Sequence, residues 1–138
     1  MKETCWNDCI NSTSSLMISP DKGKANSLLD TAKGRIEFLK ESKIKKENAN
    51  YIFESYYTSI LEILHAVALM HGFKIKNHVC IGFYIRDVIS RGDLFRVFDD
   101  LRYKRNSLTY YGQKMDFDTA KMAIIGSKRL IEKIKNFI

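Results

Sequence analysis

The sequence contains few of the residues that interrupt helices. Only one proline and seven glycines occur among its 138 residues. Proline breaks a helix interior and glycine weakens it, so their scarcity allows long helices. The strict alternation of apolar and polar residues that is typical of half-buried strands is also missing. The sequence therefore predicts an all-α protein.

Cysteine is scarce as well, with Cys5, Cys9 and Cys80 as its three occurrences. An odd and sparse set argues against a disulfide framework and favours a reducing compartment. Cys5 and Cys9 stand one helical turn apart, but no second pair of ligands follows them. We therefore expect neither a disulfide framework nor a metal site.

Long apolar runs are missing, since none reaches the roughly 18 residues that a bilayer crossing needs. The first residues, MKETCWNDCINSTSS, lack the apolar centre of a signal peptide. These two absences predict a cytoplasmic protein without membrane contact.

The composition of the chain predicts one globular domain with a basic surface. Hydrophobic residues make up 45% of the chain and charged residues 28%, which is enough apolar material for a core. The net charge of +7 favours polyanionic partners, RNA above all, through contacts with phosphates. The lysines are scattered along several segments, so a solvated basic surface is the alternative interpretation.

Apolar residues recur at three- and four-residue steps, which is the pattern of amphipathic helices. We expect a polar lead-in over residues 1–18, with a short helix anchored by Trp6, and a helical bundle domain over residues 19–138. In that bundle, Ser19 should be the N-cap and Pro20 the first residue of a helix over residues 20–42. Further helices are expected over residues 48–71 and 78–91, from Asp93 onward, and from Asp116 or Asp118 to the last residue.

The segment 48–71 has a second apolar strip beside its main one, so more than one neighbour should cover it. That predicts a central position in the bundle or a subunit contact. Gly72 should end this helix in the left-handed conformation. Because the expected loops are short, the sequence predicts an antiparallel up-and-down bundle of four to five main helices.

Residues 102–112, RYKRNSLTYYG, place several polar side chains on one helix face. Arg102, Arg105, Asn106 and Thr109 fall at i, i+3, i+4 and i+7. The planar guanidinium matches phosphate oxygens, asparagine can pair with a base or a 2′-hydroxyl, and tyrosines can stack on bases. The group suits an RNA phosphodiester. The alternative is a solvated face whose arginines pair with neighbouring aspartates or with a partner subunit.

We assign structural roles to the three histidines, because none lies within or after that segment. His65 should be a partly buried side chain on its helix, near Glu62. His71 and His78 flank a loop and should cap helix ends. Glu54 could orient an arginine across the bundle or across a subunit interface.

The order of the helices and the stretch LRYKRNSLTYYG resemble the HEPN superfamily (higher eukaryotes and prokaryotes nucleotide-binding). The resemblance covers roughly residues 20–138 and includes RIEFL at 35–39 and NYIFESYYTSILEILHAVALMHGFK at 50–74. It implies a helical bundle that forms a homodimer. In active members, a ribonuclease site that needs no metal or other cofactor lies where two subunits meet.

The motif of that family is an arginine, a polar residue, a few variable residues and a histidine. The resemblance makes Arg105 the motif arginine and Asn106 the polar residue, and it places Tyr110 where the histidine is expected. Histidine titrates near about 6.5 and tyrosine near about 10, so tyrosine would be a poor base there. The implied catalytic residues are Arg105, Asn106 and Tyr110. The implied substrate-binding residues are Arg102, Lys104, Thr109 and Tyr111.

The resemblance implies a protein of a toxin–antitoxin or defence system that binds RNA, as a weak or conditional metal-independent endoribonuclease. The alternative is a non-catalytic dimeric module that binds a nucleotide or docks on a nucleotidyltransferase-type antitoxin. In some toxins of the family, the antitoxin modifies a tyrosine two residues after the histidine. The matching position here is Gly112, with Tyr111 next to it.

Overall fold

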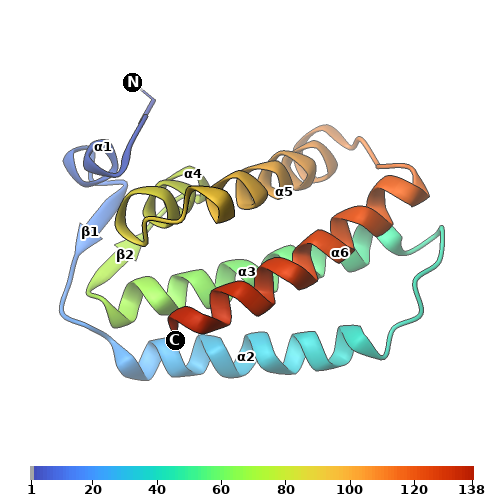
Figure 1. Ribbon diagram of the computed structural model, residues 1–138, viewed down its shortest axis with the longest axis horizontal. Coiled ribbons are helices and arrows are strands. Elements are labelled where there is room, and N and C mark those ends of the chain that lie inside the picture. Colours follow the sequence, from blue (N-terminus) through green and yellow to red (C-terminus); the bar gives the residue numbers. More distant parts are fainter. Residues whose placement is uncertain (1) are drawn as a thin grey trace.

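The computed structural model describes residues 2–138 and is built mostly of helices (Figure 1). Its long helices are α2 (Lys22–Lys40), α3 (Ala49–Met70), α5 (Gly92–Tyr111) and α6 (Phe117–Ile134). Its shorter helical elements are α1 (Trp6–Asn11), α4 (His78–Phe83), the π-helix η1 (Tyr84–Val88) and the 3₁₀ turn η2 (Lys135–Phe137). Successive long helices run in opposite directions (Figure 1). The predicted helical bundle is confirmed, whereas the homodimer stays a prediction.

Helix α3 lies at the centre of the bundle. It packs against α2 and α6 and also contacts α4 and α5. Its side chains are buried on several sides, and Tyr56, Tyr57, Ile60 and Leu64 are fully enclosed. Several neighbours therefore cover the two apolar strips of α3, as predicted for a central position in the bundle. Among the described residues, no helix combines the length and the apolar content that crossing a bilayer requires.

A small sheet joins the predicted lead-in to the loop after α3. Strand β1 (Ser15–Met17) pairs antiparallel with β2 (Phe73–Ile75), and Leu16 lies opposite Lys74. The prediction that the chain has no strands is therefore wrong at these two places. Three residues are too few to produce a recognisable alternation, so the pattern gave no signal.

The start of α2 differs from the prediction. Asp21 is its N-cap and accepts from the Lys24 N–H at 3.0 Å, so Ser19 and Pro20 precede the helix. Main-chain bonds hold this stretch against the end of α3, because Asp21 donates to the Leu69 carbonyl at 3.0 Å. Because of these tertiary contacts, which the local sequence does not reveal, the helix begins only at Lys22.

Other helix ends agree with the prediction in part. Asp116, one of two candidates, accepts from the Thr119 N–H at 2.8 Å and caps α6. Gly72 follows α3 with a φ of 87°, as expected for a left-handed terminus. Asp93 is not the N-cap of α5. It lies in the first turn, where its carboxylate pairs with Arg91 at 3.0 Å.

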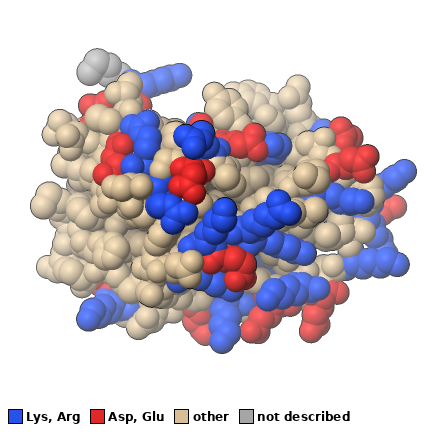
Figure 2. All heavy atoms as spheres, in the orientation of Figure 1, with Lys and Arg blue, Asp and Glu red and all other residues tan. Residues whose placement is uncertain are grey.

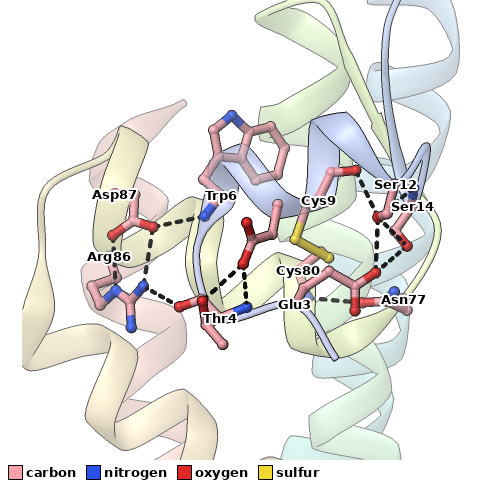
Figure 3. Close-up of a disulfide and its surroundings, with 11 residues drawn as sticks. Glu3, Thr4, Trp6, Cys9, Ser12, Ser14, Asn77, Cys80, Arg86 and Asp87 are labelled. Atoms are coloured by element: carbon pink, nitrogen blue, oxygen red, sulfur yellow. Dashed lines mark hydrogen bonds and ion pairs between the residues drawn. A yellow bond between two sulfur atoms is a disulfide. The ribbon is translucent and has the colours of Figure 1, made fainter. Parts of the chain in front are cut away.

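A disulfide between Cys9 and Cys80 joins α1 to α4 (Figure 3). The two cysteines are 71 positions apart in the sequence, and both are fully buried. The prediction of reduced cysteines is wrong for this pair, while Cys5 is free. The cysteines therefore no longer argue for a reducing compartment.

Residues 2–18, which we call the N-terminal arm, lie against β2, α4 and η1; residue 1 of the predicted lead-in is outside the described residues. Trp6 is buried, as predicted for an anchor, and begins the expected short helix. Its ring meets Phe73 and Tyr84 edge-on, with centroid distances of 5.4 and 5.2 Å. The arm is thus packed onto the bundle by aromatic contacts as well as by the disulfide.

Reduction of the disulfide should lower the free energy of unfolding by about 2–4 kcal/mol, because the cross-link restricts the unfolded chain. Urea unfolding followed by circular dichroism, with and without dithiothreitol, measures this change. Cys5→Ser keeps the disulfide and should leave the oxidised midpoint unchanged. Equal midpoints for the oxidised and reduced chain would contradict the expectation.

Candidate functional site

A surface hollow of about 310 Å³ lies between the start of α4 and the second half of α5. We call it the α4–α5 hollow. One side is formed by Lys76, Asn77, His78 and Val79, and the other by Arg102, Asn106 and Tyr110. Three of the predicted site residues thus line one hollow, together with a histidine from a different helix.

Arg105 and Tyr110 lie together beside this hollow. The Arg105 guanidinium carbon is 5.5 Å from the centroid of the Tyr110 ring, and Nη1 donates to the phenol oxygen at 3.4 Å. The same guanidinium lies 5.8 Å from the ring centroid of Tyr57, a buried residue of α3. Tyr110 exposes 67% of its surface, so the pair is open to solvent. Contact with two aromatic faces holds the cation in place without neutralising it.

Arg102 and Lys104 differ in where they point. Arg102 lines the hollow and donates to the Asp99 carboxylate at 2.9 Å. Lys104 pairs with Asp100 and lines a separate groove between α5 and α6. The structure therefore does not bring Lys104 into the hollow with the other predicted residues.

Thr109 and Tyr111 also lie outside the lining of the hollow. The Thr109 hydroxyl donates to the Glu54 carboxylate on α3 at 2.8 Å. Glu54 thus holds a hydroxyl of α5, whereas the sequence suggested that it could orient an arginine. Tyr111 exposes 76% of its surface at the end of α5.

His78 is the residue that sequence reasoning missed. We expected it to cap a helix, but Asn77 does so by accepting from the Cys80 N–H at 2.8 Å. His78 is among the residues that line the hollow, and its Nδ1 is 3.2 Å from the Tyr57 hydroxyl. No motif spacing connects His78 with α5, so only the three-dimensional fold brings it there.

The surroundings of His78 favour its neutral form. Burial lowers its pKa to about 4, and the charges of Arg105, His65 and Arg102 act in the same direction. Burial also raises the pKa of its partner Tyr57 well above the usual range, although Arg105 and Arg102 oppose that rise. At neutral pH the imidazole and the buried phenol therefore share a hydrogen bond between uncharged groups.

The basic charge is not confined to the hollow. Figure 2 shows lysine and arginine side chains over the middle and along one edge of the face in view, with acidic side chains among them. Larger hollows of about 600 and 420 Å³ lie between α5 and α6 and beside α2. Neither is lined by a histidine or a tyrosine. Only the α4–α5 hollow combines a guanidinium, an amide, an imidazole and a phenol among the hollows described for residues 2–138, which makes it the candidate site.

Within the part of the chain that the structure describes, no three histidine, cysteine, aspartate or glutamate side chains are grouped as metal ligands. Comparisons with protein-family models, with curated proteins and with solved structures find no match.

The low pKa of His78 has a consequence for stability. Between about pH 6.5 and pH 4 the unfolded chain binds a proton at this residue and the folded chain does not, so the stability supplied by this site is lost as the pH falls. His78→Gln should remove a loss on the order of 2 kcal/mol over that range, which is less than the full pKa shift gives because solvent screens this partly exposed group. Urea unfolding of both proteins at several pH values measures the difference. A His78 imidazole that titrates at 6.5 or above in NMR would contradict this expectation.

Proposed function

We propose that this chain is a HEPN-type domain that binds single-stranded RNA at the α4–α5 hollow and cleaves it weakly or conditionally without a metal. The observation that carries the proposal is the convergence of Arg102, Asn106 and Tyr110 on α5 with His78 on α4. Cations, an amide and an imidazole beside exposed tyrosines are the groups that recognition and cleavage of a phosphodiester need.

Binding would use the charged and aromatic groups at the rim. Arg105 is not paired with a carboxylate among the described ion pairs, so its guanidinium is available to a phosphate. Arg102 already donates a hydrogen bond to the Asp99 carboxylate, and a phosphate would compete with that carboxylate for the guanidinium. The exposed rings of Tyr110 and Tyr111 offer stacking surfaces for unpaired bases.

Cleavage would use His78 in place of the histidine that the motif lacks at residue 110. In transesterification a base takes the proton of the 2′-hydroxyl, the 2′-oxygen attacks phosphorus, and the 5′-oxygen leaves with a proton. The products are a 2′,3′-cyclic phosphate and a 5′-hydroxyl end. A pKa of about 4 makes His78 a weak base, which agrees with slow or conditional activity. The Tyr110 hydroxyl, whose oxygen accepts from Arg105, would donate a hydrogen bond to an oxygen of the phosphate.

A second candidate is a non-catalytic dimeric module that binds a nucleotide or docks on a nucleotidyltransferase-type antitoxin. The contact between His78 Nδ1 and the buried Tyr57 hydroxyl favours it, because an engaged, half-buried imidazole is less free to move protons. In both candidates the chain belongs to a toxin–antitoxin or defence system and acts as a homodimer. These features are part of the proposal and come from the family resemblance.

Arg105→Ala should weaken binding of a single-stranded RNA by about 5- to 20-fold and should reduce the salt dependence of binding by about one phosphate contact. Fluorescence anisotropy at several salt concentrations, in EDTA, measures both quantities. Lys33→Ala on α2 removes the same charge away from the hollow and is the matched control. If wild-type protein shows no salt-dependent binding, or if both variants bind equally well, RNA binding at this site is excluded.

His78→Gln should slow cleavage by about 10²-fold or more while changing RNA affinity little, because it removes a proton-transfer group and no formal charge. Single-turnover cleavage in EDTA, with the cyclic phosphate end identified by mass spectrometry, measures this. Tyr110→His should raise the rate by restoring the motif histidine. RNA binding without cleavage by either wild type or Tyr110→His would select the non-catalytic module.

A further inference from the structure

The wall of the hollow that carries His78 is tied at both ends to the N-terminal arm. At one end, the Lys76 N–H donates to the Ser14 carbonyl at 2.8 Å, which extends the pairing of β1 with β2. At the other end, Cys80 forms the disulfide with Cys9. The residues between these ties, 76–79, are the ones that line the hollow from this side.

Further contacts join the arm to η1, which follows α4. The Trp6 N–H donates to the Asp87 carboxylate at 2.8 Å, and Arg86 donates to the Thr4 carbonyl at 3.0 Å (Figure 3). The Trp6 ring packs against Tyr84. The arm therefore bridges β2, α4 and η1.

The position of His78 depends on such ties because α4 is six residues long and continues only into the five residues of η1. A helix of this length has little stability of its own, so tertiary contacts must set its direction. The Asn77 cap bonds to the N–H of Cys80, the same residue that the disulfide holds. The cystine, the cap and the imidazole thus form one connected unit.

We propose that Cys9 and Cys80 are positioning residues for the site: their disulfide holds the 76–79 wall so that the His78 imidazole lies opposite Arg102 and Asn106. The role proposed for the imidazole rests on the proposed function, whereas the positioning of His78 does not. The N-terminal arm is in this view a part of the site and more than a lead-in. Both sulfur atoms are buried, so the disulfide acts as a lasting structural tie.

The test compares Cys9→Ala/Cys80→Ala with Cys5→Ser, which loses a thiol and keeps the disulfide. The imidazole signals of His78, assigned with His78→Gln, are followed by heteronuclear NMR, with His65 on α3 as an internal reference. Without the disulfide, the His78 signals should shift and broaden and its pKa should rise by at least about one unit toward 6.5, as expected for a wall that moves into solvent. A folded double variant whose His78 signals match those of Cys5→Ser would overturn the inference.

RNA binding separates this inference from the proposed function. If wild type binds a single-stranded RNA oligonucleotide, the double variant should lose the His78-dependent part of the cleavage rate, at least about tenfold, with a smaller change in affinity. If wild type binds no RNA but His78 still moves in the double variant, the positioning role stands and the proposed function falls.

A second variant covers the case in which the double variant does not fold. Asp87→Ala keeps the disulfide and removes both the acceptor of the Trp6 N–H and the carboxylate partner of Arg86, which loosens the contacts of the arm with η1. The His78 signals should then shift in the same direction by a smaller amount. His78 signals that stay unchanged in this folded variant, as judged by far-UV circular dichroism, would overturn the inference as well.

Discussion

Helix α3 is buried among its neighbours, and the rest of the bundle packs around it. Its Tyr57 also contacts residues at the α4–α5 hollow. The Tyr57 ring is fully enclosed and stacks on Phe98 of α5, with a centroid distance of 5.9 Å. Its hydroxyl reaches His78, and its ring face lies under the Arg105 guanidinium. One core side chain therefore sets both sides of the α4–α5 hollow, so the packing that stabilises the bundle also places the groups of the site.

The electrostatics of the hollow suit an anion. Arg102 and Arg105 both act against a proton on His78, which is one reason why its pKa is low. A phosphate bound by these arginines would offset their charge and so favour protonation of the imidazole. The group that accepts a proton poorly in the free protein would thus become a better base when an RNA backbone is present. This coupling gives a physical basis for the proposed activity, which would be weak and would depend on the bound RNA.

The parts of the fold with strong local signals could be predicted, and the parts made by tertiary contacts could not. The long periodic helices and the Gly72 terminus follow from apolar spacing and from glycine's conformational freedom. The delayed start of α2 and the Cys9–Cys80 pair depend on contacts between distant segments. In the site, Arg102 and Asn106 were found because they share one helix face, and Tyr110 was found from the motif resemblance. His78 could not be found because α4 brings it from elsewhere in the chain. The strands were too short to leave a pattern.

We propose that an arginine-bearing face of α5 and an imidazole from α4 form one RNA site. The most direct measurement is an NMR titration of the three histidines with a single-stranded RNA oligonucleotide at constant salt. We expect the His78 signals to shift in a saturable way and the pKa of His78 to rise toward its ordinary value, while the signals of His65 move less. RNA binding that leaves His78 unchanged, or a His78 response that persists undiminished in Arg105→Ala, would contradict this proposal.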